Sequence, residues 1–455
     1  MGRISRRSFL KGAGISALAT VLSACQQEDI PMLSLVDEIG EPGTQIAIIE
    51  GCPWGPAVRG TILCLPQAVK SSSVSADKFT VIESKEVFDP ETSRHMLASA
   101  PRTVVEAVTV TPDGRVTKLS SRYILLTFRI QPDVGCPLCY DPLTGQSTRC
   151  DPYQLKIFLN APLKTLAGGP MTGLAIDPNV SLAAPCLKNV DLNGVFTGPE
   201  GHTFCYASYQ PQHPAGEKHP LVVWLHGAGE GGEDPAVVLL GNQVSSLFSD
   251  AFQSVMGGAY ILAPQTPTFW MCYNENGDWS DNPGVSSVYR EDLMALIQNY
   301  VAQNPGIDPD RIILGGCSNG GYMTMDLVMH HPGYFAAAYP ICEAYLDAGI
   351  TDEELHAIAD TRLPIWFVYA RNDTTVPPQL YAAPTMARLA AMDADLYSTV
   401  WPSVTDATGR LTGPDGEPYQ YNGHCSWIYF FQGLCKDDAT GADLWTWMSR
   451  QHRTI

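Results

Sequence analysis

The chain has 455 residues, enough for two or three domains, and 45% of them are hydrophobic, so a large core is expected. Its formal net charge of −19 at pH 7 argues against nucleic acid or an anionic membrane surface as a partner, because like charges repel. After the N-terminal region, no apolar run is long enough to span a bilayer.

The first 25 residues are predicted to be an export signal and not part of the fold. Ser5–Lys11, SRRSFLK, is a twin-arginine pattern, and the short apolar run after it ends in LSAC. This ending resembles a bacterial lipobox, so we expect Cys25 to carry a lipid that anchors the protein at the cell surface or in the periplasm. The alternative is a signal that a peptidase removes to release a soluble protein. Residues 26–45 are predicted to be a polar tether.

Cysteine number and compartment together predict disulfide bonds. Of thirteen cysteines one is Cys25, which leaves an even number in a chain bound for an oxidising exterior. Zinc is the alternative for Cys136 and Cys139 of CPLC together with Cys150. No second CxxC and no histidine pair lies nearby, so we expect no metal, and nothing in the sequence indicates a cofactor.

The segment from residue 46 to residue 190 is rich in short β-strand patterns. Apolar runs with β-branched residues recur at regular spacing, separated by turn formers such as Asp113-Gly114, and no long helical period interrupts them. This pattern predicts a sandwich of the immunoglobulin type. The predicted strands are RGTILCLP, DKFTVIES, VVEAVTVT, YILLTFRI and YQLKIFLN.

From residue 191 to residue 455, predicted strands alternate with predicted helices. HPLVVWLHG is a continuous apolar run typical of a buried parallel strand, whereas YREDLMALIQNYVAQN has apolar residues at helical spacing. The alternation continues through DRIILGG, GGYMTMDLVMHHP and LPIWFVYARND. It predicts an α/β domain with a mostly parallel sheet and flanking helices.

The motif Gly316-Cys317-Ser318-Asn319-Gly320 fits G-x-S-x-G and lies between a predicted strand and a predicted helix. Glycines flank such a serine because side chains would clash at the strained turn that projects the hydroxyl above the sheet. We therefore interpret Ser318 as a nucleophile. The pentapeptide alone occurs by chance in many proteins, so this interpretation depends on finding its partners.

An acid and a base are expected downstream of the serine. The strand IWFVYARND runs into Asp373, and His424 lies in YNGHCSW after a further predicted strand. The chain order Ser, Asp, His is that of α/β hydrolases. In such a triad Asp373 orients His424, which takes the proton of Ser318 and later returns it to the leaving group.

An oxyanion hole requires two backbone N–H groups. Asn319, the residue after the nucleophile, is one candidate donor. Ala228 is the other, with Gly229 as the alternative, because the glycine-rich loop after HPLVVWLHG lets its backbone approach a substrate. His226 in that loop is interpreted as shaping the loop.

Each of these residues also has a simpler interpretation. Asp373 lies in a good turn sequence, His424 could be structural, and Cys317 could be an ordinary small buried residue. Jointly, these interpretations would need three residues to fall by chance at the right strand ends in the right order. The catalytic interpretation is therefore favoured.

A resemblance to a known family is carried by PLVVWLHGAGEGG, ILAPQTP, IDPDRIILGGCSNGGYMTMDL, FAAAYPICEA and GHCSWI. Together they resemble an esterase and peptidase branch of the α/β hydrolases, related to polyhydroxyalkanoate depolymerases and to feruloyl and acetylxylan esterases. Some members have an N-terminal immunoglobulin-like domain, to whose opening WGPAVRGTILCL is similar. The resemblance implies an α/β hydrolase preceded by an all-β immunoglobulin-like sandwich, with Ser318, Asp373 and His424 as the triad.

A narrower resemblance concerns the cysteines beside the triad. Tannases and related feruloyl esterases also have a cysteine before the serine and one after the histidine, joined to each other. This resemblance implies a Cys317–Cys425 disulfide; the alternative is two unlinked buried thiols. Tannases insert a large lid between serine and acid, whereas only 55 residues separate Ser318 from Asp373 here, so their substrate cannot be carried over.

The favoured hypothesis is a serine esterase that cleaves small or polymer-linked carboxylic esters through an acyl-enzyme. One alternative is a serine peptidase of the prolyl-oligopeptidase-like branch, although no propeller-like gate precedes the hydrolase domain. Another is a non-catalytic binding lipoprotein. Trp270, Trp279 and Trp427 are candidate substrate contacts and equally candidate packing residues. No motif indicates the acyl or alcohol specificity or the oligomeric state.

Overall fold

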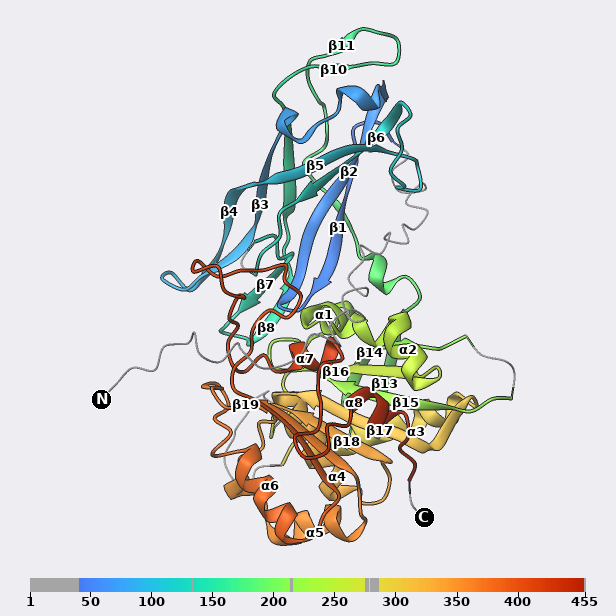
Figure 1. Ribbon diagram of the computed structural model, residues 1–455, viewed down its shortest axis with the longest axis vertical. Coiled ribbons are helices and arrows are strands. Elements are labelled where there is room, and N and C mark those ends of the chain that lie inside the picture. Colours follow the sequence, from blue (N-terminus) through green and yellow to red (C-terminus); the bar gives the residue numbers. More distant parts are fainter. Residues whose placement is uncertain (1–40, 133, 213–215, 275–277, 279–285, 454–455) are drawn as a thin grey trace, which may run out of the picture.

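The computed structural model describes residues 41–132, 134–212, 216–274, 278 and 286–453. An all-β part lies above an α/β part in Figure 1. The predicted export signal, including Cys25, lies outside the described residues. None of the helices that the structure describes is long and apolar enough to cross a membrane.

The N-terminal part is a β-sandwich, as the strand patterns predicted. A five-stranded sheet has the order β12-β1-β2-β6-β5, a three-stranded sheet has the order β4-β3-β9, and two short hairpins are β7–β8 and β10–β11. The strands are β1 Gln45–Cys52, β2 Gly55–Val69, β3 Phe79–Asp89, β4 Arg94–Arg102, β5 Val104–Val110, β6 Ser121–Phe128, β7 Leu138–Asp141, β8 Gln146–Arg149, β9 Tyr153–Leu159, β10 Leu163–Lys164, β11 Pro170–Met171 and β12 Ser181–Ala183. Short 3₁₀ turns are η3 Ser71–Ser73, η4 Ala76–Lys78 and η5 Pro185–Leu187.

The α/β part contains an eight-stranded sheet of order β13-β14-β16-β15-β17-β18-β19-β20. The strands are β13 Asp191–Thr197, β14 Thr203–Tyr209, β15 His219–Leu225, β16 Tyr260–Gln265, β17 Ile307–Cys317, β18 Ala337–Ile341, β19 Ile365–Ala370 and β20 Leu396–Trp401. The pairs β13–β14 and β14–β16 are antiparallel and the remaining pairs are parallel. The mostly parallel α/β-hydrolase sheet that the sequence predicted is confirmed.

Helices pack on both faces of this sheet (Figure 1). Apolar side chains of α1, α2, α7 and α8 belong to one core, and those of α3, α4, α5 and α6 belong to the other. The helices are α1 Pro235–Gly241, α2 Asp250–Met256, α3 Arg290–Gln303, α4 Asn319–His330, α5 Asp352–Asp360, α6 Ala382–Ala391, α7 Trp427–Phe431 and α8 Leu444–Met448, with 3₁₀ turns η6 Val244–Phe248 and η7 Asp347–Gly349.

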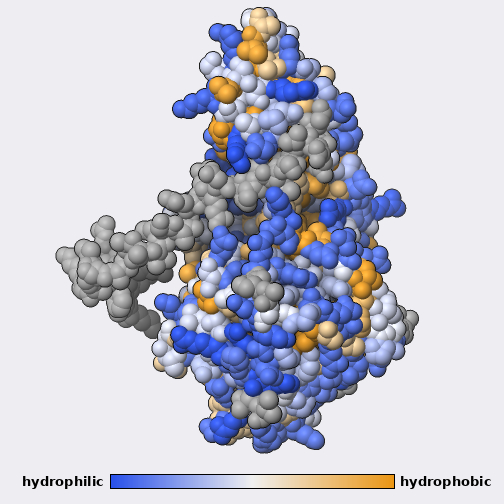
Figure 2. Space-filling view, turned by 90° about the vertical axis from the view of Figure 1, so that its right-hand side faces the viewer, coloured by the Kyte–Doolittle hydropathy of each residue, from blue (hydrophilic) through white to orange (hydrophobic). Residues whose placement is uncertain are grey.

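The first of these cores continues into the β-sandwich. It joins sandwich residues such as Leu63 and Leu126 to Trp224 of the central strand β15. Because close-packed interiors transmit displacement, the two parts are mechanically linked through their common core. On the face seen in Figure 2, the outer surface is mostly hydrophilic with scattered hydrophobic patches.

The hairpin β7–β8 forms polar contacts with the α/β part. Ser147 N–H donates to the carbonyl of Gly229 at 2.8 Å, and the Gln146 side-chain amide donates to the carbonyl of Pro267 at 2.5 Å. Arg149 forms an ion pair with Asp234 at 2.5 Å. The sandwich therefore contacts the loop from which the oxyanion donors were predicted.

Candidate active site

Ser318 lies on a strained turn between β17 and α4. Its φ of 55° and ψ of −116° are outside the regions that L residues favour. The flanking glycines are required because a Cβ on Gly316 would lie 2.4 Å from the carbonyl oxygen of Leu225, and one on Gly320 would lie 2.0 Å from it. Close packing of the helix start against β15 therefore forces the serine into this conformation.

Ser318, His424 and Asp373 form a continuous hydrogen-bonded chain. His424 Nε2 is 2.8 Å from Ser318 Oγ, and His424 Nδ1 is 2.7 Å from Asp373 Oδ2. The two ring nitrogens thus contact different partners, so one can act as a base while the other is oriented by a carboxylate. The structure brings together the three residues that the strand ends indicated.

The loop after β19 positions Asp373. Its Oδ1 accepts backbone N–H bonds from Thr375 and Val376, each 2.9 Å long, and its side chain is buried. A Cβ on Gly423 would lie 2.3 Å from the Asn372 side chain, so the histidine loop packs directly on the aspartate loop. This contact fixes the spacing between acid and base.

The environment of His424 changes its acidity. Burial opposes the charged ring, but the side chains of Cys342 and Asp373 outweigh burial and raise the pKa of His424 above its ordinary value. A raised pKa favours the imidazolium that forms when Ser318 gives up its proton. It also means that the neutral base requires a higher pH.

The predicted oxyanion donors lie in two places, at the start of α4 and in the loop after β15. Asn319 is the first residue of α4, so its N–H belongs to the helix N-terminus, where backbone donors lack helical acceptors. Ala228 is exposed in the loop after β15, whereas an isolated parallel bridge joins Gly229 to Gln146 of the sandwich. Ala228 is therefore the better candidate of the two loop residues.

His226 and Trp270 hold this loop in place. Trp270 Nε1 donates to the carbonyl of His226 at 3.0 Å, and its backbone N–H donates to the Asn319 side chain at 2.7 Å. His226 Nε2 accepts from Thr266 N–H, and burial lowers the pKa of His226 to about 4, so the ring is neutral. His226 shapes the loop, in agreement with the sequence interpretation.

Glu230 is a buried acid in this loop that the sequence analysis missed. Its Oε2 accepts from Gly227 N–H at 2.9 Å and its Oε1 accepts from the Asn242 amide at 3.0 Å. Burial raises the pKa of Glu230 to about 8. The available signal was an acid inside a glycine-rich loop that follows a fully apolar strand.

The three tryptophans predicted as possible substrate contacts lie in different environments. Trp270 is fully buried and both of its N–H groups are bonded, so it is a packing residue and its assignment as a substrate contact is corrected. Trp427 is partly exposed, and its ring meets that of His424 edge-on with centroids 5.5 Å apart. Trp279 lies outside the described residues.

All described cysteines are free thiols, so the predicted Cys317–Cys425 bond is not present. Burial, followed by the neighbouring Cys342, Glu230 and Cys425 side chains, raises the pKa of Cys317 well above its usual range. Three thiols therefore neighbour one another beside the triad. Cys342 lies in FAAAYPICEA, one of the segments that carry the family resemblance, but no sequence pattern gave this cysteine a role.

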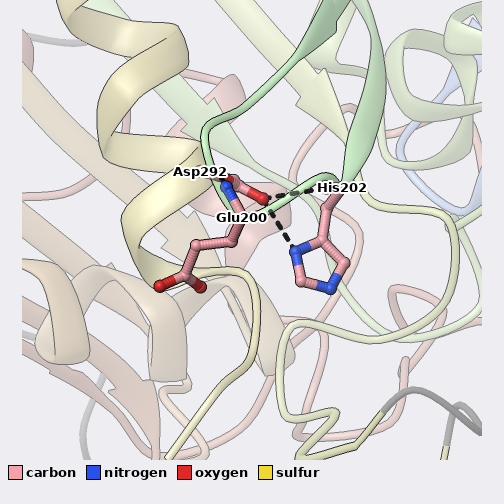
Figure 3. A group of neighbouring side chains, drawn as sticks. All are labelled: Glu200, His202 and Asp292. Atoms are coloured by element: carbon pink, nitrogen blue, oxygen red, sulfur yellow. Dashed lines mark hydrogen bonds and ion pairs between the residues drawn. The ribbon is translucent and has the colours of Figure 1, made fainter.

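One group of three potential metal ligands occurs among the described residues, namely Glu200, His202 and Asp292. Buried Asp292 accepts from the backbone N–H groups of Glu200 and His202 and contacts His202 Nδ1 at 2.8 Å. A Glu200 carboxylate oxygen lies within 4.8 Å of the ligand atoms of the other two residues, and Figure 3 marks no contact from this carboxylate to them. Asp292 thus holds the β13–β14 turn against α3, and these contacts account for its burial without an ion.

Comparison with known proteins agrees with this architecture. Residues 45–171 match the family model of the esterase Ig-like N-terminal domain, and residues 280–374 match the model of the prolyl oligopeptidase family. No curated protein sequence matches the chain.

A solved structure shares the fold. A thermostable esterase superposes with a TM-score of 0.67 at 22% identity, covering 90% of this chain and 99% of that one. An acylaminoacyl peptidase of Pyrococcus horikoshii has a TM-score of 0.37 at 17% identity, covering 58% of this chain and 44% of that one. The chain therefore combines an esterase Ig-like N-terminal domain with an α/β-hydrolase domain.

Proposed function

We propose that the protein is a serine esterase that cleaves carboxylic esters through a covalent acyl-enzyme. The observation that carries this proposal is the hydrogen-bonded chain from Ser318 Oγ through His424 to Asp373. A serine hydroxyl is a weak nucleophile until an adjacent base accepts its proton, and this arrangement supplies that base.

The chemistry follows from the contacts. His424 Nε2 takes the proton as Ser318 Oγ attacks the ester carbonyl, and Asp373 stabilises the imidazolium. The N–H groups of Asn319 and Ala228 stabilise the oxyanion, a contribution of about 10²–10³ in rate per donor in other enzymes. His424 then protonates the leaving alcohol, and water attacks the acyl-enzyme by the same steps.

A peptidase is the second candidate function. It is favoured by the match of residues 280–374 to the prolyl oligopeptidase family. The match of residues 45–171 to an esterase domain favours the ester hypothesis. Both hypotheses use the same triad, so substrate assays have to separate them.

The test compares p-nitrophenyl esters from acetate to octanoate with peptide p-nitroanilides. Wild type is expected to hydrolyse the esters, Ser318→Ala to fall to background, and the exposed control Ser120→Ala to retain full activity. Turnover of anilides alone would establish a peptidase. Failure on both substrate classes would favour a binding protein, and an active Ser318→Ala variant would contradict the triad mechanism.

We further propose export by the twin-arginine route and a lipid anchor on Cys25. The supporting observations are the SRRSFLK pattern and the LSAC ending. Expression with radiolabelled palmitate is expected to label wild type in the membrane fraction, Cys25→Ala to abolish the label, and Arg6→Lys with Arg7→Lys to retain the precursor inside the cell. Equal labelling of the Cys25→Ala variant would exclude the anchor.

A further inference from the structure

Cys342 lies at the end of the strand that separates the two halves of the triad. Strand β18 lies between β17 and β19 in the sheet. Ser318 follows β17 and Asp373 follows β19, so the ring of His424, which contacts both, spans the end of β18. Cys342 is the first residue after β18, which places it beside this ring.

The backbone of Cys342 is fixed in an uncommon conformation. Its N–H donates to the carbonyl of Val368 in β19 at 2.7 Å, and its φ is +36°, in the region that L residues rarely adopt. Only 2% of the residue is exposed. Such strained, buried positions often lie at functional sites, where the surrounding structure maintains them.

Cys317, Cys342 and Cys425 share one apolar core, and the first two differ in the elements that they contact. Cys317 and Cys342 belong to the core between the sheet and the sandwich, and Cys425 packs against that core. The Cys317 sulfur faces the loop after β15, because a Cβ on Gly227 would lie 3.4 Å from it. Cys342 instead donates its N–H to Val368 of β19, and the loop bearing His424 and Cys425 packs at Gly423 against Asn372, in the loop that follows β19.

The electrostatics of the cluster agree with this placement. Burial and then Cys342 raise the pKa of Cys425 to about 12, and Cys342 precedes Glu230 and Cys425 among the neighbours that raise the pKa of Cys317. Cys342 is also the first neighbour that raises the pKa of His424 against the effect of burial. Cys342 therefore neighbours both of the other thiols and the base.

Cys342 and Cys425 are free thiols in this structure. We propose that on oxidation they form a disulfide bond that ties the His424 loop to the end of β18. This pairing differs from the Cys317–Cys425 bond implied by the resemblance to tannases. The bond itself does not depend on the proposed function. Its effect on catalysis rests on that function, because it acts through His424.

The bond forms by thiol–disulfide exchange with a low-molecular-weight disulfide such as oxidised glutathione. The thiolate of partly exposed Cys425 attacks the reagent, forming a mixed disulfide and releasing one thiolate. The thiolate of Cys342 then displaces the second reagent thiolate from the Cys425 sulfur. The protein loses two electrons and two protons, and one reagent disulfide becomes two thiols.

The experiment maps the partner of Cys425 by mass spectrometry after oxidation with a glutathione redox buffer and alkylation of the remaining thiols. Trypsin alone cannot resolve the question, because no Lys or Arg lies between Arg311 and Arg362 and one peptide holds both Cys317 and Cys342. Chymotrypsin separates them, since Tyr322 and Tyr339 lie between them. Trp427 provides a further cut after Cys425.

A cross-linked peptide joining Cys342 to Cys425 is expected in wild type and in Cys317→Ser, and it should be absent from Cys342→Ser. The proposal is overturned if Cys425 is joined to Cys317. It is equally overturned if Cys425 is joined to any other cysteine, remains a glutathione adduct or is alkylated as a free thiol. The cross-linked peptide from the wild-type protein is sufficient to identify the partner of Cys425. A variant that fails to fold therefore does not affect the result.

Activity supplies an independent measurement. Oxidation ties the His424 loop to the end of β18, so the oxidised enzyme should lose ester turnover at a higher urea concentration than the reduced enzyme. In Cys342→Ser oxidation should cause no such rise, whereas Cys317→Ser should behave as wild type. A cross-link with an unchanged urea midpoint would leave the bond established and contradict its effect on the His424 loop. Loss of all ester turnover would instead contradict the proposed function.

Discussion

Ser147, in the sandwich, donates its backbone N–H to the carbonyl of Gly229, in the loop that precedes α1 of the catalytic domain. A Cβ on Gly229 would lie 3.4 Å from the ring of Tyr140, in the neighbouring strand of the same hairpin. Gly229 directly follows Ala228, the candidate oxyanion donor. The sandwich thus supports the geometry of the catalytic loop.

Gly145→Ala is predicted to reduce ester turnover through this contact. Gly145 has a φ of +68°, and a Cβ there would lie 2.2 Å from the Phe269 ring of the catalytic domain. The hairpin must shift away from the oxyanion loop, so we expect kcat to fall about 10-fold or more, since small displacements of catalytic groups are costly.

Gly168→Ala is the matched control for this prediction. Gly168 has a similar φ of +94°, but a Cβ there meets nothing within 4 Å. It lies between β10 and β11, at the end of the sandwich farthest from the catalytic domain (Figure 1). The control should lose some stability through backbone strain while keeping kcat. Equal kcat losses in both variants would show that strain, and not the Phe269 contact, is responsible.

The pH–rate profile should report the raised pKa of His424. Only the neutral ring can accept the proton of Ser318, so kcat/KM should rise with pH and reach half its plateau above the ordinary histidine pKa of about 6.5. Asp373→Asn removes a charge that raises this pKa. The low-pH limb of the kcat/KM profile should therefore move to lower pH, while the plateau value of kcat/KM falls by about 10⁴-fold.

The control for this profile is Asp360→Asn, which removes an exposed carboxylate whose side chain is 76% accessible. It should alter neither the plateau nor the limb. A limb that stays in place in Asp373→Asn would show that Asp373 does not set the acidity of His424.

The triad could be predicted from sequence because Ser318 and Asp373 come at the ends of strands whose patterns are visible locally, and His424 lies in the long loop after the last strand, β20. Parallel strands deliver such residues to one edge of the sheet, so Ser318, Asp373 and His424 were identifiable without knowing the strand order. Cys342 was not, because its position beside His424 depends on β18 lying between β17 and β19. That order is a property of the assembled sheet.

Burial and long-range packing explain why the sequence did not predict three other features of the structure. A tryptophan in a loop can face substrate or core, and only the packed structure shows that Trp270 is enclosed. The contact between Ser147 and Gly229 joins segments of two domains, so no local pattern indicates it. Glu230 looked like an ordinary loop acid because its two hydrogen-bond donors are contributed by the folded loop and α1 region.

Trp427→Ala is predicted to weaken substrate binding and turnover together. The Trp427 ring meets His424 edge-on, and its Nε1 has no hydrogen-bond partner among the described residues. It is therefore the described tryptophan best placed to contact a bound ester. We expect kcat/KM for octanoate to fall more than that for acetate, because a longer acyl chain would lose more apolar contact.

Trp427→Phe should retain most of the wild-type kcat/KM, since it keeps an aromatic ring against His424. If Trp427→Ala lowers kcat/KM equally for all chain lengths, the ring positions His424 and does not contact the acyl chain. Steady-state kinetics on the ester series distinguishes these outcomes.

Glu230 should make the protein less stable as pH rises. Burial raises the pKa of Glu230 to about 8, so between its unfolded value near 4.5 and about 8 the folded state binds more protons than the unfolded state. The free energy of unfolding therefore falls with pH across this window, by at most about 1.4 kcal/mol per pH unit for one proton. Buried Glu343, whose pKa is also raised to about 8, acts in the same direction.

Glu230→Gln removes one of these two titrations while keeping the size of the side chain. Urea unfolding at several pH values between 5 and 8 should therefore give a shallower decline in stability than in wild type. Glu233→Gln, an exposed change three residues along the same loop, should leave the slope unaltered. Identical slopes in wild type and Glu230→Gln would mean that Glu230 is ionised in the folded protein. In that case the N–H of Gly227 and the amide of Asn242 compensate a buried charge, and the oxyanion loop is held by an anion.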